Sequence, residues 1–196
     1  MPDLRIVVLA SGAGTLLQAL LDSDIGRRIV AVGSDQSEAP ALARAWAADV
    51  PTFVVPMAED REVWNIDLVQ HLQAHEADFV VTAGFMRVLG GTVIEAFENR
   101  IINSHPALLP SFPGAHAVRD AVESGVKVTG CTIHIVDEGV DTGPIIAQCP
   151  VTIDDGDTVE ALHERIKEHE RTLLVDVLGR IVREGVCVDG RTVALG

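Results

Sequence analysis

Residues 6–21 have the sequence IVVLASGAGTLLQALL, an apolar run followed by a loop with two glycines and a segment with helical spacing. Apolar residues at four consecutive positions predict a strand that is buried on both faces, as in a parallel sheet. Short apolar runs and helical segments keep alternating through the first half of the chain. This pattern predicts parallel strands that are joined by crossover helices.

Five strands are predicted from the apolar runs, at Ile6–Leu9, Ile29–Val32, Phe53–Val55, Phe79–Val81 and Ile101–Asn103. The helices predicted between them are Thr15–Leu21, Ala41–Ala48, Arg61–His75 and Thr92–Phe97. The expected fold class is therefore α/β, a Rossmann-like open and mostly parallel sheet with helices on both faces.

The pattern changes after residue 115. A helix at Ala117–Ser124 is followed by extended segments at Cys131–Val136 and Ile145–Ile153, which we expect to extend the sheet as antiparallel strands with one face less buried. Asp157 and Glu160 have the spacing of an acidic capping box, so they predict the start of a long helix. The chain then ends in a predicted hairpin whose turn is Asp189-Gly190.

Composition limits the class of protein. The 196 residues are 47% hydrophobic and carry 29 acidic against 15 basic side chains, for a net charge of −14. Such a chain has a globular core, and without a basic cluster it repels nucleic acid and anionic membrane surfaces. The start of the chain has too few apolar residues for a signal segment, no apolar run reaches about 20 residues, and the three cysteines form no CxxC pair. We expect a cytoplasmic protein with neither a zinc knuckle nor a disulfide framework.

The loop Ser11–Thr15 directly follows the first predicted strand and opens a helix, so its backbone N–H groups can bind a phosphate. It matches neither nucleotide fingerprint, because Leu17 stands where the third dinucleotide glycine is required and no Gly-Lys-Ser/Thr follows. Asp35 lies about 20 residues further on, where a ribose-binding acid would stand. A nicotinamide enzyme therefore stays open as an alternative, and so does a simple turn at Asp35.

Residues 101–114, IINSHPALLPSFPG, place polar side chains directly after a buried strand. Ligands of open α/β sheets bind at the carboxyl ends of strands, and positions i and i+2 share a face, so Asn103 and His105 can converge there. The alternative for His105 is a structural hydrogen bond to a nearby carbonyl. Residues 134–144, HIVDEGVDTGP, form a stiff acidic loop, which could be a solvated turn. If it folds against the first segment, a carboxylate can hold His105 in one tautomer and favour its charged form.

Four stretches together resemble the phosphoribosylglycinamide formyltransferase family in its stand-alone form. They are SGAGT at 11–15, GFMRVL at 84–89, INSHPALLPSFPG at 102–114 and HIVDEGVDTGPIIAQ at 134–148. The resemblance covers nearly the whole chain and implies a single formyltransferase domain over residues 1–196. Residues 1–100 would form its phosphate- and ribonucleotide-binding half, and residues 101–196 its catalytic and folate-binding half. The implied reaction transfers the formyl group of 10-formyltetrahydrofolate to glycinamide ribonucleotide in de novo purine biosynthesis, without a metal.

The resemblance also implies a role for individual residues. The catalytic set falls on Asn103, His105 and Asp141. The ribonucleotide-binding residues would be Gly12, Ala13, Gly14, Thr15, Leu16, Lys167 and Glu170. The folate-binding residues would be Arg61, Met86, Arg87, Val88, Leu89, Asn103, Val136, Asp137, Glu138, Gly139, Val140 and Asp141. Leu16 departs from the family pattern, which often has Asn there, so this position would contact phosphate through its main chain only.

Several alternatives stay open. A formyltetrahydrofolate deformylase uses the same co-substrate, but such enzymes usually carry an additional domain and a second His where this chain has Pro106. Methionyl-tRNA formyltransferases carry an extra basic domain, which this acidic chain does not contain. A non-catalytic nucleotide-binding module would bind without turnover. The expected partners are small molecules, and a homodimer is compatible with the sequence.

Overall fold

The computed structural model describes residues 4–196. Backbone contacts divide the chain into two compact units, unit 1, which ends at Asn103, and unit 2, Ser104–Gly196. The prediction that the chain has no signal segment includes residues 1–3, which lie outside the described residues. No helix within residues 4–196 combines the length and the low polarity that crossing a bilayer requires.

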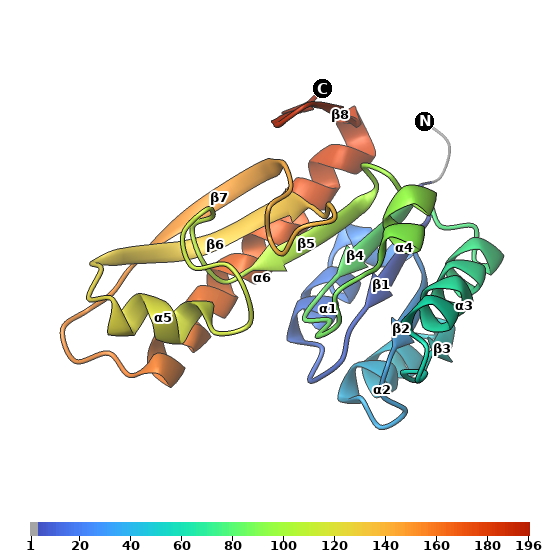
Figure 1. The fold of residues 1–196 in the computed structure, drawn as a ribbon, viewed down its shortest axis with the longest axis horizontal. Coiled ribbons are helices and arrows are strands. Elements are labelled where there is room, and N and C mark those ends of the chain that lie inside the picture. The colour runs from blue at the N-terminus through green and yellow to red at the C-terminus, as the bar shows by residue number, and fades with distance from the viewer. Residues whose placement is uncertain (1–3) are drawn as a thin grey trace. The chain divides into compact units, whose positions relative to one another are not determined.

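The sheet has seven strands in the order β3-β2-β1-β4-β5-β6-β7. The strands that begin in unit 1 are parallel and are β1 (Ile6–Leu9), β2 (Ile29–Ser34), β3 (Thr52–Val54), β4 (Phe79–Thr82) and β5 (Ile101–His105). The first strand lies between β2 and β4, and its Val7 pairs with Ala31 on one side and Val80 on the other (Figure 1). All five predicted strands are therefore confirmed, with ends that differ by a few residues.

Helices cover both faces of this parallel sheet. They are α1 (Thr15–Leu21), a 3-10 turn η1 (Asp24–Arg28), α2 (Pro40–Ala47), α3 (Arg61–Ala74) and α4 (Gly91–Ala96). Crossover connections between parallel strands are right-handed. The chain steps in one direction from β1 to β3 and in the opposite direction from β3 through β4 to β5. Helices α1 and α2 therefore lie on one face of the sheet, and α3 and α4 lie on the other. The contacts agree, because α1 packs against α2 and α3 against α4. The predicted Rossmann-like architecture is thereby confirmed.

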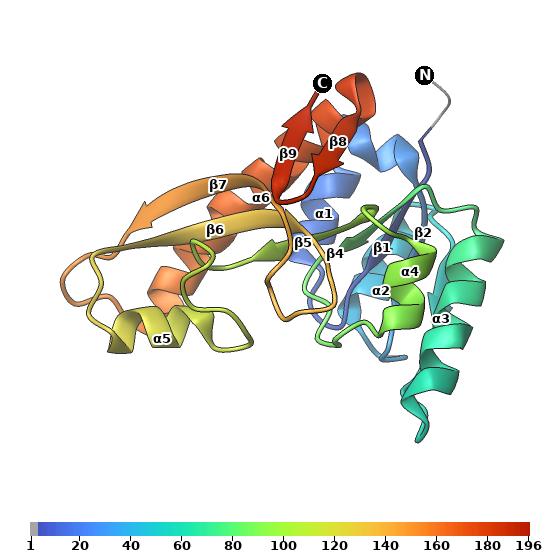
Figure 2. The same cartoon turned by 45° about the horizontal axis from the view of Figure 1, so that its top comes forward.

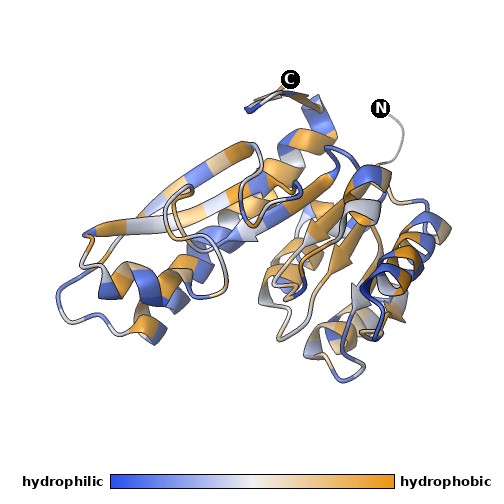
Figure 3. Cartoon of the chain, viewed as in Figure 1, coloured by the Kyte–Doolittle hydropathy of each residue, from blue (hydrophilic) through white to orange (hydrophobic). Residues whose placement is uncertain are grey.

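The core of unit 1 explains why these segments form strands. All four residues of β1 are buried, as are Val80 and Val81 of β4, and Figure 3 shows these central strands as the most hydrophobic part of the unit. Each such side chain contributes about 1.5–3 kcal/mol when it leaves water. The strand order reverses between β1 and β4, and ligands of open α/β sheets bind in the crevice outside such a switch point.

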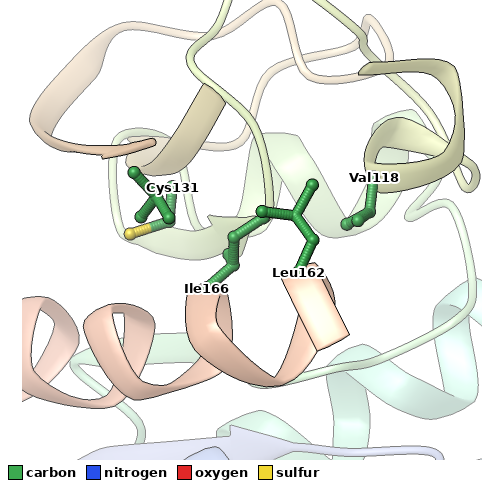
Figure 4. Packing of buried hydrophobic residues seen from close by; sticks show 5 residues of the cluster. Val118, Cys131, Leu162 and Ile166 are labelled. Carbon is green, nitrogen blue, oxygen red and sulfur yellow. The ribbon is translucent and has the colours of Figure 1, made fainter. Parts of the chain in front are cut away.

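Unit 2 contains the end of β5 and the elements that the second half of the sequence predicts. They are α5 (Ala117–Glu123), β6 (Val128–Ile135), β7 (Ile145–Thr152), the long helix α6 (Val159–Glu184), β8 (Val186–Asp189) and β9 (Thr192–Leu195). The strands β6 and β7 are antiparallel, as predicted. Helix α6 packs on both of them, and its Leu162 and Ile166 point at Val118 of α5 and Cys131 of β6 (Figure 4).

Burial in β6 differs from the expectation. One face of this strand was expected to be less buried, but every residue from Thr129 to Ile135 is buried. Two of its polar side chains, Thr132 and His134, bond to backbone groups, whereas the buried hydroxyl of Thr129 has no hydrogen-bond partner among the described residues. Thr132 Oγ1, for example, donates to the Ala107 carbonyl at 2.6 Å and accepts from the Leu109 N–H at 3.0 Å. The alternation of polar and apolar residues therefore marks hydrogen bonding here, and not exposure.

The start of α6 also differs from the prediction. The N-cap residue is Thr158, whose Oγ1 accepts from the Ala161 N–H at 3.1 Å. The carboxylate of Asp157 has other partners, because it pairs with Arg165 and accepts from the Asp154 N–H. The predicted capping box is wrong, since a threonine one position later competes successfully for the cap.

The C-terminal hairpin is confirmed, but its turn is shifted by one residue. Asp189 pairs with Thr192, so the two-residue loop is Gly190-Arg191 and not Asp189-Gly190. Gly190 has a φ of +55°, which suits glycine at the first central position of a hairpin turn. Figure 2 shows β8 and β9 side by side beyond the end of α6.

Candidate active site

His105 ends β5 and is held between two acceptors. Its side chain is almost fully buried, with Nε2 at 2.8 Å from the Phe112 carbonyl and Nδ1 at 3.3 Å from Asp141 Oδ2. A carbonyl oxygen can only accept, so Nε2 carries the proton in its hydrogen bond to Phe112, and Nδ1 forms an ion pair with Asp141 when the ring is charged. The two sequence segments singled out for His105 and Asp141 do meet in unit 2.

Asp141 is the centre of this cluster. Its Oδ2 also accepts from the Gly114 N–H at 2.8 Å, and its Oδ1 lies 3.5 Å from His134 Nε2. Burial alone raises the pKa of Asp141, but the hydrogen bonds from His134 and Gly114 and the positive rings of both histidines outweigh this effect. The resulting pKa lies below the usual value for aspartate, so Asp141 is a carboxylate at neutral pH.

His134 is a member of the cluster that the sequence analysis assigned no role. It lies in β6, is buried, and its Nδ1 is 2.8 Å from the Ile135 carbonyl. That carbonyl accepts from Nδ1, so Nε2 can donate to the Asp141 carboxylate only when the ring carries both protons. The sequence feature that could have identified His134 is its position as the first residue of the acidic stretch 134–144. A polar residue in a buried strand next to an acidic loop is a candidate partner for that loop's carboxylates.

The acidic loop after β6 is braced from within unit 2. Asp137 Oδ1 accepts from Thr142 Oγ1 at 2.6 Å and from the Gly139 N–H at 3.2 Å, and the Thr142 carbonyl accepts from Arg191 Nη1 at 2.9 Å. The side chain of Asp137 therefore holds the loop together. Val136 is half-buried, whereas Glu138, Gly139 and Val140 are exposed and open to a ligand.

Asn103 is the last residue of unit 1. Its Oδ1 accepts from Thr82 Oγ1 at 2.7 Å, which fixes the end of the amide that faces β4. Side chains alternate along a strand, so Asn103 and His105 share one face of β5 while Ser104 points to the other.

Ser104 leads to the buried end of α6. Its Oγ donates to Glu170 Oε1 at 2.6 Å, and the Glu170 side chain is buried. Burial raises the pKa of Glu170, against the lowering effect of Ser104 and of the charges on Lys167 and Arg171. The predicted ribonucleotide residues Lys167 and Glu170 do not form a pair, because Lys167 Nζ bonds Glu164 at 2.7 Å.

The glycine loop lies in unit 1, between β1 and α1. Gly14 has a φ of +69°, and a Cβ there would lie 2.8 Å from the Cα of Ala41, so only glycine fits. Ala13 is exposed, Gly12 and Thr15 are partly exposed, and the Leu16 side chain is buried. The leucine therefore faces the core, and only its backbone can serve a ligand.

The predicted folate segment follows β4. Met86 and Val88 are 70% and 60% exposed, whereas Leu89 is buried. Arg61 of α3 donates to the Val88 carbonyl, so the structure does bring this arginine to the segment. The guanidinium of Arg87 turns inward to Asp35, at 2.7 Å. Because both Asp35 oxygens are engaged within the protein, the ribose-binding role that a nicotinamide enzyme needs has no support here.

Comparison with known proteins agrees with these motifs. The family model described as "Formyl transferase" matches residues 4–178. A phosphoribosylglycinamide formyltransferase of Mycobacterium tuberculosis is 52% identical over 197 residues, covering 98% of this chain and 91% of that protein. One from Bacillus subtilis is 36% identical, covering 91% and 94%. The crystal structure of glycinamide ribonucleotide transformylase 1 from Symbiobacterium toebii matches with a TM-score of 0.94 at 42% identity, covering 98% of this chain and 94% of that one.

Proposed function

The chain belongs to the formyl transferase family, and we propose that it transfers the formyl group of 10-formyltetrahydrofolate to the amine of 5′-phosphoribosylglycinamide. It is an enzyme of purine biosynthesis with small-molecule substrates, and its family uses a folate-type formyl donor. The observation that carries the proposal is the buried ion pair between His105 and Asp141, at 3.3 Å.

His105 supplies a charged donor for the oxygen of the formyl group. When the substrate amine attacks the formyl carbon, negative charge develops on that oxygen, and a donor that is already in place stabilises it. In the structure Nε2 lies 2.8 Å from the Phe112 carbonyl, so substrate binding would have to exchange this acceptor for the formyl oxygen.

Asp141 keeps His105 charged and handles the proton. The attacking nitrogen must lose one proton, and the departing N10 of the folate must gain one. A carboxylate that is ionised at neutral pH can accept the first proton or pass it on through water, and it also stabilises the imidazolium. Asn103, on the same face of β5, would add an amide donor to the oxyanion.

The two substrates would bind to separate sets of residues. We propose that residues 12–16, Lys167 and Glu170 bind the ribonucleotide, with backbone N–H groups on its phosphate. The folate would contact Arg61, the segment 86–89 and the acidic loop 136–141. Met86 and Val88 are the exposed apolar side chains of the segment 86–89, and they offer apolar surface to a flat aromatic ring.

The test is an assay with one substrate and then with both. Protein mixed with 10-formyltetrahydrofolate alone should leave it intact, and formylation should begin only when the ribonucleotide is added. Consumption of the folate without the second substrate would instead indicate a deformylase. A binding module would consume neither compound, and either result would overturn the proposal.

The variant His105→Ala should lose about 10²–10⁴-fold in kcat, the range for a group that acts in general acid–base catalysis. The matched control is His169→Ala, an exposed histidine of α6 in the same unit. It should keep the wild-type rate, and both variants should have the wild-type circular dichroism spectrum. Wild-type kcat in a folded His105→Ala enzyme would remove His105 from the mechanism.

A further inference from the structure

Asp35 closes a ring of hydrogen bonds among three loops of unit 1. Its Oδ1 accepts from Ser11 Oγ at 2.6 Å, and its Oδ2 accepts from Arg87 Nε at 2.7 Å. Ser11 Oγ in turn accepts from the Met86 N–H at 2.9 Å. Because Met86 and Arg87 are neighbours in the chain, the ring is closed through the backbone of the segment after β4.

Each atom in the ring has a defined role. A serine hydroxyl has one proton, which Ser11 gives to Asp35, and its lone pair receives the Met86 N–H. Gln36 Nε2 also donates to Asp35 Oδ2, at 2.9 Å, and the Asp35 side chain is 1% exposed. Both oxygens of this buried carboxylate accept hydrogen bonds, one of them from a charged donor, so Asp35 is a rigid anchor.

The segment is anchored at its other end as well. Arg61 donates to the Val88 carbonyl, and Asn65 Oδ1 accepts from the Gly90 N–H at 3.2 Å. Between the two anchors the side chains alternate, with Arg87 and Leu89 turned inward and Met86 and Val88 turned out to solvent. The anchors therefore hold two apolar side chains outward, against the tendency of apolar groups to bury themselves.

We infer that Asp35 is a positioning residue for folate binding, which holds the segment 84–89 so that Met86 and Val88 face the folate. This inference rests on the proposed function. It also changes the role of Arg87, whose guanidinium is neutralised by Asp35 and so acts by fixing the loop, not by pairing with an anionic part of the folate.

The test is a double-mutant cycle of Asp35→Asn and Arg87→Gln. Each single variant should raise the KM for 10-formyltetrahydrofolate and the Kd for a 5,8-dideazafolate analogue by about tenfold, the effect of losing a hydrogen bond to a charged group. The kcat should stay within about twofold, because neither variant touches His105 or Asp141. The double variant should also lose about tenfold, since the two residues act as one unit.

Two other outcomes would overturn the inference. A loss of about 100-fold in the double variant would show that Arg87 binds folate directly, independently of Asp35. An unchanged Kd for the analogue in folded Asp35→Asn would show that the ring positions nothing. If Asp35→Asn does not fold, Ser11→Ala breaks the same ring at the Met86 contact and should raise the same Kd, and a wild-type Kd in that variant would count against the inference.

Asp78→Asn is the matched control. Asp78 precedes β4 at the opposite end of the strand and accepts from the Arg5 N–H at 2.8 Å, so it undergoes the same chemical change away from the segment. Its folate constants should equal those of the wild type. The analogue titration needs no turnover, so wild-type protein that fails to formylate the ribonucleotide would overturn the proposed function while the Kd values still test Asp35.

Discussion

Two aspartates, one in each unit, follow strands of the sheet and differ in their partners. Asp35 follows β2 and is bound by Arg87, Ser11 and Gln36. Asp141 lies in the loop after β6 and is bound by two histidines and a backbone N–H. In both cases burial alone raises the pKa, and the hydrogen bonds outweigh it, so the pKa of each lies below the ordinary value.

The difference lies in what the partner cations can do. A guanidinium does not lose its proton in a protein, so the charge around Asp35 is fixed. An imidazole, unlike a guanidinium, can transfer a proton, so the charge next to Asp141 is not fixed. We therefore propose that similar carboxylates serve as a permanent anchor in one unit and as part of a proton-transfer cluster in the other.

The largest expected effect comes from Asp141→Asn. We expect kcat to fall by about 10²–10⁴-fold, because the amide can neither accept a proton nor stabilise the charged form of His105. The pH dependence of kcat should change as well, since the ionising group is gone. Steady-state rates with saturating substrates across pH 5–9 measure both.

The same substitution at Asp35 sharpens the comparison. Asp35→Asn should act on the folate KM and leave the shape of the pH profile alone. If Asp141→Asn changed only a KM, as expected for Asp35→Asn, the two carboxylates would have the same role and the distinction drawn here would be wrong.

Periodicity was enough to predict most of the fold. Consecutive apolar residues, as at Ile6–Leu9, identify strands that are buried on both faces, and this local signal does not depend on the rest of the chain. The errors came where side chains compete. Thr158, and not Asp157, is the N-cap of α6. In β6 the alternation of polar and apolar residues predicted one exposed face, but seven consecutive residues are buried.

The sites show a sharper limit. The two stiff loops after strands predict that a carboxylate of the acidic loop can meet His105, whereas Asp141 itself is singled out only by the resemblance to the family. Asp35 and Arg87 are 52 positions apart in the sequence. His134 and Asp141 come together only because the chain turns after β6. Neither contact can be predicted from the periodicity of apolar residues. Such contacts follow from strand order and loop geometry, which the sequence alone does not supply.

A smaller effect is expected from His134. Its Nε2 lies near Asp141 Oδ1, whereas His105 lies near Oδ2. The variant His134→Leu removes one hydrogen bond to a charged group and should lower kcat by roughly 10- to 100-fold. His134→Gln keeps an uncharged donor and should recover most of that rate while changing the pH profile. Equal rates in the leucine and wild-type enzymes would show that Asp141 needs only His105.

The smallest expected effect is on the free energy of unfolding. Removing the charge should lower this free energy at Asp35 and raise it at Glu170. The folded pKa of Asp35 lies below its unfolded value of about 3.9, so its contribution is present above that pH and is lost as the pH falls through the folded pKa. Asp35→Asn should therefore be less stable than the wild type at pH 6, by about 1 kcal/mol. The difference should vanish toward pH 2.

For Glu170 we expect the opposite change of stability with pH in the same experiment. Burial raises its folded pKa, so its contribution is fully present below the unfolded value of about 4.3 and is lost as the pH rises through the folded pKa. Glu170→Gln keeps an acceptor for Ser104 without the charge, and it should be more stable than the wild type at pH 8 by roughly 0.5–2 kcal/mol. Urea unfolding of both variants between pH 2 and pH 8 measures the two curves. Parallel curves would mean that neither carboxyl titrates differently in the folded and unfolded chains, and a more stable Asp35→Asn at pH 6 would show that the Arg87 pair does not offset the burial of its charge.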